Sequence, residues 1–130
     1  MTPDLRRILY IEDEDDIRTV AKMALEAIGG FEVRDYASGA EGVAAARESR
    51  PDLVLLDVMM PGMDGPATLK ALRAQSETAA TPVIFMTAKV QPTEVEHYKS
   101  LGALGVVAKP FSPLEVSDEI RRLWSAAPAA

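Results

Sequence analysis

The chain has 130 residues, of which 48% are hydrophobic and 26% are charged, and its net charge at pH 7 is −6. This length suits a single domain over residues 1–130, and we expect its core at about residues 5–124 and frayed ends. The acidic charge argues against direct binding to nucleic acid or to a membrane surface, and no apolar run reaches the ~20 residues of a membrane span. The absence of cysteine and the single histidine exclude disulfides, thiolate chemistry and histidine-rich metal sites. A cytoplasmic location fits these features.

The first half of the chain alternates between apolar segments and segments with helical periodicity. Residues 7–12 predict a strand, and apolar residues then recur on one helix face until Gly29-Gly30 ends the pattern. The inward-facing positions of this helix are Ile17, Val20, Ala21, Ala24, Leu25 and Ile28. Residues 31–36 alternate between apolar and polar and predict a strand near a sheet edge, and Ser38-Gly39-Ala40-Glu41 has the spacing of a capping box for a second helix. Residues 52–57 are almost entirely apolar and predict a strand that is buried on both faces.

The second half repeats the alternation. A third helix is expected to start near Asp64-Gly65-Pro66, and the apolar residues 82–87 predict the fourth strand. A fourth helix follows Pro92, and residues 104–108 predict the fifth strand. Ser112-Pro113-Leu114-Glu115 combines a capping box with proline at the first helical position and is expected to open the fifth helix. The apolar stripes of these helices are Leu69 and Leu72, then Val95, Tyr98 and Leu101, then Val116, Ile120, Leu123 and Trp124.

Five consecutive strand–helix units predict an α/β fold. We expect a doubly wound, five-stranded parallel sheet in the order 2-1-3-4-5, flanked by five helices, which is the flavodoxin-like arrangement. In such sheets ligands bind at the carboxyl ends of the strands. The residues at those ends are therefore the candidates for chemistry.

Polar side chains occupy four of these strand ends. They are Glu12 and Asp13, Asp57, Thr87 and Lys109. Carboxylates about 4 Å apart repel each other by roughly 4 kcal/mol at the effective dielectric of a protein site, so either some of them hold protons or a cation lies among them. An all-oxygen cluster favours Mg²⁺, with Mn²⁺ as a possible substitute. Lys109 and Thr87 supply a positive charge and a hydroxyl donor for a phosphoryl group, and Asp57 is the candidate nucleophile. The acids at residues 14–16 instead fall at the start of the first helix, where its dipole favours negative charge.

The chain resembles the receiver domain of bacterial two-component response regulators over roughly residues 5–124. The motifs that carry the resemblance are ILYIEDE, LVLLDVMMPGMDG, PVIFMTA and VVAKPF. The segment DVMMPGMDG after an apolar strand is the most specific of them. Because the chain is short and shows no output domain, it is similar to stand-alone regulators of the chemotaxis type.

This resemblance implies a role for each strand-end residue. It implies that Asp57 accepts a phosphoryl group from a histidine kinase or a histidine phosphotransfer protein, and that such a protein acts as a phosphorelay switch rather than an enzyme. The implied Mg²⁺ ligands are Asp13, Asp57 and the backbone carbonyl of Met59, with Glu12 binding a metal-bound water. The Thr87 hydroxyl and the Ala88 backbone amide are implied to bind the phosphoryl group, and Lys109 to form an ion pair with it. The resemblance also implies a cis peptide between Lys109 and Pro110, and phosphorylation of the domain by small phosphodonors.

One position, Val106, departs from the family pattern, and two others, Met59 and Lys89, are expected to affect the lifetime of the phosphorylated state. Val106 stands where many relatives carry tyrosine or phenylalanine, so the usual coupled movement of hydroxyl and aromatic ring is not available. We expect the face made by the fourth helix, the fifth strand and the fifth helix to respond through the loop after Thr87 and repacking around Val106. By resemblance this face binds the downstream protein target, and its charged residues are His97, Lys99, Glu119, Arg121 and Arg122. Met59 cannot orient an attacking water and Lys89 could cover the phosphoryl group, so self-dephosphorylation is expected to be slow.

Several other functions remain as alternatives. The chain could be the excised receiver domain of a longer transcriptional or enzymatic regulator. A Mg²⁺-dependent phosphohydrolase of the haloacid-dehalogenase type also uses an aspartyl phosphate, but it leaves DVMMPGMDG unexplained and has no general acid at Met59. A flavin-binding protein shares the expected fold, yet the acids after the first strand would repel a phosphate. A receiver-like module that has lost phosphorylation is disfavoured, because every expected group of the site is present.

Overall fold

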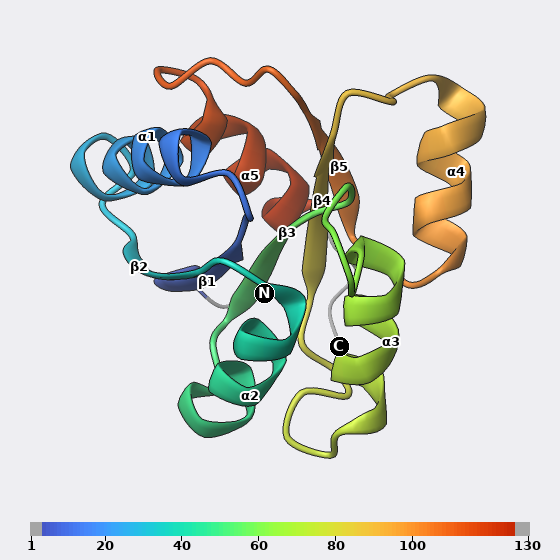
Figure 1. Ribbon diagram of the computed structural model, residues 1–130. Helices are drawn as coiled ribbons and strands as arrows, with labels where there is room; N and C mark the ends of the chain where they lie inside the picture. The colour runs from blue at the N-terminus through green and yellow to red at the C-terminus, as the bar shows by residue number, and fades with distance from the viewer. Residues whose placement is uncertain (1–3, 127–130) are drawn as a thin grey trace.

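Strands and helices alternate along residues 4–126, which are the residues that the computed structural model describes (Figure 1). The strands are β1 (Arg7–Ile11), β2 (Glu32–Tyr36), β3 (Leu53–Asp57), β4 (Val83–Thr87) and β5 (Gly105–Ala108). The helices are α1 (Asp15–Ala27), α2 (Gly39–Ser49), α3 (Gly65–Ala74), α4 (Pro92–Ser100) and α5 (Val116–Ser125). Each predicted strand is found within one residue of its expected bounds. The expected fraying concerns mainly residues 1–3 and 127–130, which lie outside the described residues.

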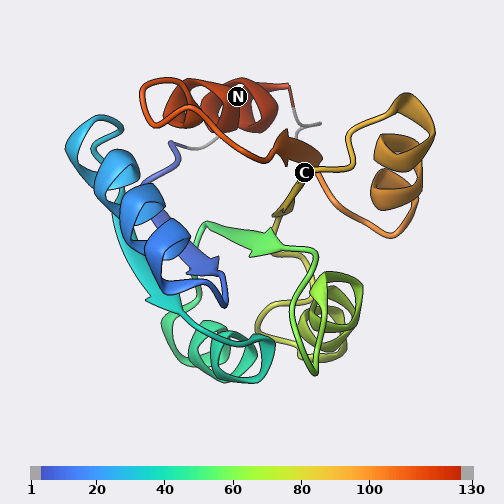
Figure 2. The ribbon, with the colours of Figure 1, turned by 45° about the horizontal axis from the view of Figure 1, so that its top comes forward.

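All five strands are parallel and form one sheet in the order β2-β1-β3-β4-β5, as predicted. α1 and α5 cover one face of this sheet, and α2, α3 and α4 cover the other (Figure 2). The central strands β3 and β4 are buried along their whole length, which explains their nearly continuous apolar sequences. Among the described residues no helix has the length and apolar character needed to cross a membrane.

Local capping interactions position the helices that follow β2 and β3. The Ser38 hydroxyl accepts a hydrogen bond from the Glu41 amide at 3.2 Å, which confirms the predicted cap of α2. The Asp64 carboxylate accepts from the Ala67 amide at 2.9 Å and caps α3, where Pro66 lies in the first turn. These caps fix where each helix begins after its strand and loop.

Two predicted apolar stripes are wider than the buried surfaces that the structure forms. In α1 the buried residues are Ala21, Ala24 and Leu25, whereas Val20 is 47% and Ile28 is 52% exposed. Val20 lies toward the loop after β5 instead of the sheet, and Ile28 is already the C-cap residue of α1. In α4 only Tyr98 of the predicted stripe is buried, because Leu101 lies past the last helical turn.

The start of α5 differs from the prediction. The helix begins at Val116, and residues 113–115 form a turn instead of its first turn. The Ser112 carbonyl accepts hydrogen bonds from the Glu115 and Val116 amides at 3.0 and 2.9 Å, and no side chain caps α5. The capping-box spacing was therefore misleading, because the Glu115 amide, which the Ser112 side chain was expected to cap, donates to the Ser112 carbonyl instead.

Candidate functional site

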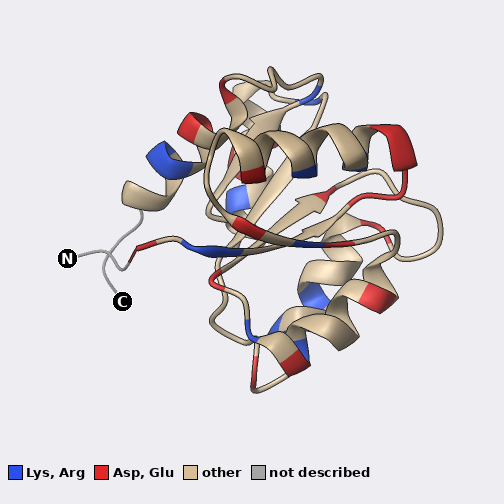
Figure 3. Cartoon of the chain, turned by 90° about the vertical axis from the view of Figure 1, so that its left-hand side faces the viewer, with Lys and Arg blue, Asp and Glu red and all other residues tan. Residues whose placement is uncertain are grey.

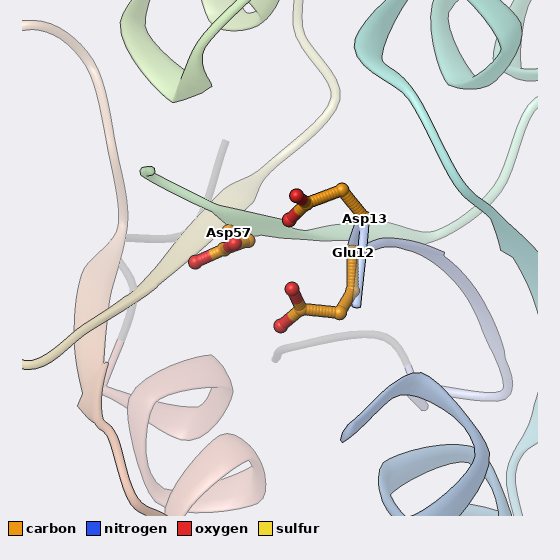
Figure 4. Close-up of side chains that lie close together, drawn as sticks. All are labelled: Glu12, Asp13 and Asp57. Atoms are coloured by element: carbon orange, nitrogen blue, oxygen red, sulfur yellow. The ribbon is translucent and has the colours of Figure 1, made fainter. Parts of the chain in front are cut away.

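The carboxyl ends of β1 and β3 bring three acidic side chains together. Ile11 pairs with Leu56, so the next residues along each strand, Glu12 and Asp57, lie beside each other at the edge of the sheet. One carboxylate oxygen from each of Glu12, Asp13 and Asp57 lies within 4.8 Å of the others. Figure 4 shows the side chains of Glu12 and Asp13 extending toward that of Asp57. Glu12 and Asp57 are almost fully buried, with 0% and 2% exposure, so their negative charges are poorly screened by water.

Lys109 enters this cluster from the end of β5. Its Nζ donates to Glu12 Oε1 at 2.8 Å and to Asp57 Oδ1 at 3.1 Å. The Lys109 amide donates to the Thr87 carbonyl at 2.9 Å, and the Lys109–Pro110 peptide is cis, as the resemblance implied. One ammonium group therefore bridges two of the three carboxylates.

The buried charges shift the pKa values of the groups that carry them. Burial raises the pKa of Glu12 to about 7, and the neighbouring Asp57 adds to this rise while Lys109 opposes it. Burial opposes the charged form of Lys109, but its hydrogen bonds to Glu12 and Asp57 and their charges outweigh this effect and raise the pKa of Lys109. At neutral pH the Lys109 ammonium is therefore charged, and the Glu12 carboxylate is divided between its protonated and ionised forms.

The acidic cluster fits a hard divalent cation. The three side chains offer only oxygen donors, which Mg²⁺ and Mn²⁺ prefer. In addition, Asp13 Oδ1 is buried and forms no hydrogen bond with any residue that the structure describes. A buried carboxylate oxygen without a donor is costly, and coordination of a cation would satisfy it. Receiver domains bind Mg²⁺ in an acidic pocket of this kind, and this chain provides the carboxylates for it.

Thr87 lies at the end of β4, next to the strand that carries Asp57. It is 2% exposed, and its hydroxyl accepts a hydrogen bond from the Lys89 amide at 3.1 Å. Ala88 lines a mostly apolar groove together with Lys109 and Pro110. Thr87 is thus the last residue of β4, and Ala88 and Lys109 directly follow β4 and β5. These are the strand ends at which the sequence predicted them.

Arg18 is a residue of the site that the sequence did not indicate. Its guanidinium donates to the Glu12 carbonyl at 2.8 Å, to Asp35 at 3.0 Å and to Asp15 at 2.6 Å. These bonds tie the backbone that carries the acids to α1 and to β2. The spacing of Asp15 and Arg18 on one helix face was visible in the sequence, but the contacts with Glu12 and Asp35 depend on the fold.

The run of acids after β1 divides between the site and the helix. Glu14 is the N-cap residue of α1, and Asp15 and Asp16 lie in its first turn. The acidic end of α1 is visible in Figure 3. Negative charge at this end stabilises the helix dipole, as predicted.

Comparisons with known proteins agree with this geometry. Residues 8–121 match the response regulator receiver domain family. Over 116 residues the chain is 36% identical to the DNA-binding response regulator MtrA of Mycolicibacterium smegmatis, covering 89% of this chain and 49% of MtrA. It is 38% identical over 114 residues to the transcriptional regulatory protein CseB of Streptomyces avermitilis, covering 88% of this chain and 47% of CseB. The chain thus spans about half the length of these curated relatives.

Solved structures show the same architecture. The chemotaxis response regulator CheY4 of Vibrio cholerae aligns with a TM-score of 0.84 and 32% identity, covering 92% of this chain and 99% of CheY4. The receiver domain of a sensor histidine kinase from Pseudomonas aeruginosa, which holds a magnesium ion in its active site cleft, aligns with a TM-score of 0.80 and 28% identity, covering 95% of this chain and 100% of that one. The strand order, the acidic cluster and the family match agree, and the chain belongs to the receiver domains of two-component response regulators.

Proposed function

We propose that residues 1–130 act as one receiver domain whose Asp57 accepts a phosphoryl group from a phosphohistidine on a kinase or phosphotransfer protein. Receiver domains are signalling phosphoacceptors rather than classical enzymes. The observation that carries the proposal for this chain is the environment of Asp57. Its carboxylate is nearly buried, lies among two further carboxylates and contacts the Lys109 ammonium at 3.1 Å.

In the proposed step a carboxylate oxygen of Asp57 forms a bond to phosphorus while the bond from phosphorus to the imidazole nitrogen breaks. The electron pair of that bond stays with the imidazole, and the product is an acyl phosphate on Asp57. Asp13, Asp57 and the Met59 carbonyl would hold Mg²⁺, with Glu12 acting through a water. When bound, the metal supplies positive charge that offsets the repulsion between the carboxylates and an anionic phosphodonor. Lys109 is placed to exchange its contacts with Glu12 and Asp57 for one with a phosphoryl oxygen.

The signal would leave the site through the loop between β4 and α4. The Thr87 hydroxyl now accepts from the Lys89 amide, so turning this hydroxyl to the phosphoryl group would release the start of that loop. The Ala88 amide would then donate to the same group. We propose that α4, β5 and α5 respond as one face, and that this face binds the downstream target.

Packing around Val106 supports a route that does not need an aromatic residue on β5. Val106 pairs with Phe85 on β4, and the Phe85 ring lies edge-on to Tyr98 of α4 with centroids 5.2 Å apart. Tyr98 is 8% exposed, so a shift of α4 would change the contacts of Phe85 and Val106 together. Near-identical amide spectra of this face with and without a phosphoryl mimic would contradict the proposal.

The surface charges narrow the face that a target could contact. His97 and Lys99 lie exposed on α4, and Glu119 pairs with Arg122 on α5 at 3.7 Å. Arg121, which was expected on the same face, instead donates to the Gly29 carbonyl and lies 4.3 Å over the Phe31 ring. Arg121 is therefore turned toward the segment between α1 and β2 and is not part of the proposed contact surface.

A second candidate function concerns the output of the switch. MtrA is named as a DNA-binding regulator and is about twice as long as the aligned region. The chain could therefore control a DNA-binding segment of a longer protein, as the first alternative above supposed. A cytoplasmic location and the absence of direct contact between this domain and nucleic acid remain predictions.

The proposed function is tested by intact mass spectrometry after incubation with Mg²⁺ and acetyl phosphate. We expect an adduct of about 80 Da on the parent and none on Asp57→Asn. Omission of Mg²⁺ should suppress the adduct. A parent that stays unlabelled by acetyl phosphate and by histidine kinases, or an Asp57→Asn variant that is labelled equally, would refute the proposal.

A further inference from the structure

Tyr10 lies directly beneath the acidic site. Tyr10 is in β1 and precedes Glu12, the residue directly after the strand, by two positions; the Glu12 amide continues the sheet pairing with the Tyr36 carbonyl at 3.0 Å, so Tyr10 and Glu12 point to the same face. Tyr10 pairs with Leu55 of β3, which in turn precedes Asp57 by two residues. Tyr10 and Leu55 thus form the layer of the core below Glu12 and Asp57, on the face that α1 and α5 cover.

The hydroxyl of Tyr10 is buried without a satisfactory partner. The residue is 0% exposed, and its hydroxyl forms no hydrogen bond of acceptable geometry with any described residue. It is nevertheless close to the acids: burial raises the pKa of Tyr10, the charges of Glu12 and Asp57 raise it further, and so does a contact between its hydroxyl and the Glu12 carboxylate that falls short of hydrogen-bond geometry. A buried hydroxyl in this state is costly, and it is available as a donor to a carboxylate above it.

The donors to Glu12 change during the proposed reaction. In the structure Glu12 Oε1 accepts from Lys109 at 2.8 Å, and Oε2 accepts from the Glu14 amide at 3.3 Å. If Lys109 turns to a phosphoryl oxygen, the Glu12 carboxylate loses its only charged donor among the described residues. Glu12 would keep the longer bond from the Glu14 amide and its contact with a metal-bound water, but Oε1 would lose its short hydrogen bond, and the Tyr10 hydroxyl would be free to donate in its place.

We propose that Tyr10 is a positioning residue for phosphoryl transfer: its hydroxyl donates to the Glu12 carboxylate when Lys109 leaves it for the phosphoryl group. This inference rests on the proposed function and adds a residue to it. The hydrogen bond from Tyr10 to Glu12 would form only while Lys109 contacts the phosphoryl group. Deleting the hydroxyl therefore slows phosphorylation without weakening the resting fold.

The test compares Tyr10→Phe with Ser117→Ala. Ser117 also has a buried hydroxyl without a partner among the described residues, but it lies on α5 against Gly29, away from the acids. Stability is measured by urea unfolding in EDTA, and phosphorylation by intact mass over a series of acetyl phosphate concentrations at saturating Mg²⁺. We expect both variants to be at least as stable as the parent in EDTA. Only Tyr10→Phe should be labelled more slowly, by about tenfold in maximal rate with the half-saturating donor concentration unchanged, the loss expected for one hydrogen bond to a charged group.

A double variant checks that the effect passes through Glu12. In a Glu12→Ala background, where the carboxylate acceptor is gone, the Tyr10→Phe change should cause no further loss of rate. A Tyr10→Phe variant labelled as fast as the parent, one that is less stable in EDTA, or one that still loses rate in the Glu12→Ala background would overturn this inference alone. Failure of the parent itself to accept the phosphoryl group would instead overturn the proposed function, and this inference with it.

Discussion

Replacing Lys109 with methionine tests whether one ammonium group stabilises the metal-free site. Lys109 contacts Glu12 and Asp57 at 2.8 and 3.1 Å, and the carboxylate side chains are 0% and 3% exposed. At an effective dielectric of about 20, each attraction at about 3 Å amounts to about 5 kcal/mol before desolvation is counted. Breaking such a buried pair by removing one partner costs about 3–5 kcal/mol. Because the lysine side chain is itself 17% exposed, we expect the lower end, a loss of about 3 kcal/mol at pH 8.

Protons should partly replace the missing ammonium. Glu12 has a pKa of about 7 with Lys109 present, so it becomes protonated readily once the opposing charge is gone. The destabilisation of Lys109→Met should therefore be smaller at pH 5.5 than at pH 8. Mg²⁺ should restore part of the stability at pH 8, since a cation again separates the carboxylates.

The assay is urea unfolding in EDTA at both pH values, with Lys89→Met as the control. Lys89 is exposed and has no ion pair with any residue in the described part of the chain, so its replacement should change stability by less than about 0.5 kcal/mol. If Lys109→Met lowers the free energy of unfolding equally at pH 5.5 and pH 8, the loss comes from the packing of the lysine side chain and not from its charge. A loss no larger than that of the control would show that the ammonium does not stabilise the site.

Two further predictions concern Glu12 and Met59. The pKa of Glu12 in the folded state lies above its ordinary value of 4.5, so the folded state binds the proton more tightly than the unfolded state does. In EDTA the free energy of unfolding should therefore fall as pH rises from 4.5 through 7, by at most about 3 kcal/mol. Glu12→Gln should flatten this decline. A parent whose stability is constant over this range would contradict it. The Met59 thioether cannot orient water, so the phosphorylated parent should decay slowly and Met59→Asn should shorten its half-life by roughly tenfold, the equivalent of one hydrogen bond. Met23→Asn changes an exposed methionine on α1 and is the control; rapid decay of the parent would refute the reasoning.

The strand pattern predicted most of the fold because it depends on local chemistry. Continuous apolar runs such as residues 52–57 read directly as buried parallel strands, and the residue after each run then falls at the sheet edge. The convergence of Glu12 with Asp57 follows from the strand order alone. The start of α5 could not be predicted in this way, because the Glu115 amide donates to the Ser112 carbonyl in a turn before the helix and not to the Ser112 hydroxyl.

Interactions between distant segments could not be predicted from the sequence for a different reason. Val20 has the spacing of a core residue, but whether it is buried depends on where the loop after β5 lies. Arg18 of α1 reaches Asp35 on β2, and Tyr10 lies in the layer under Asp57 because β1 and β3 pair in one register. Local patterns therefore identified the reacting groups, while the residues that position them became visible only in three dimensions.

The charges of the site suggest why a metal and a phosphoryl group would bind together. Above the pKa of Glu12, three carboxylates and one ammonium leave two negative charges uncompensated. A divalent cation would neutralise them, and only then would an anionic donor meet no net repulsion. Transfer of a phosphoryl group would add negative charge again and would attract Lys109 away from Glu12. In the proposed reaction the resting ion pair is therefore the interaction that phosphorylation would break, and Tyr10 below it and Thr87 beside it are the side chains that would respond.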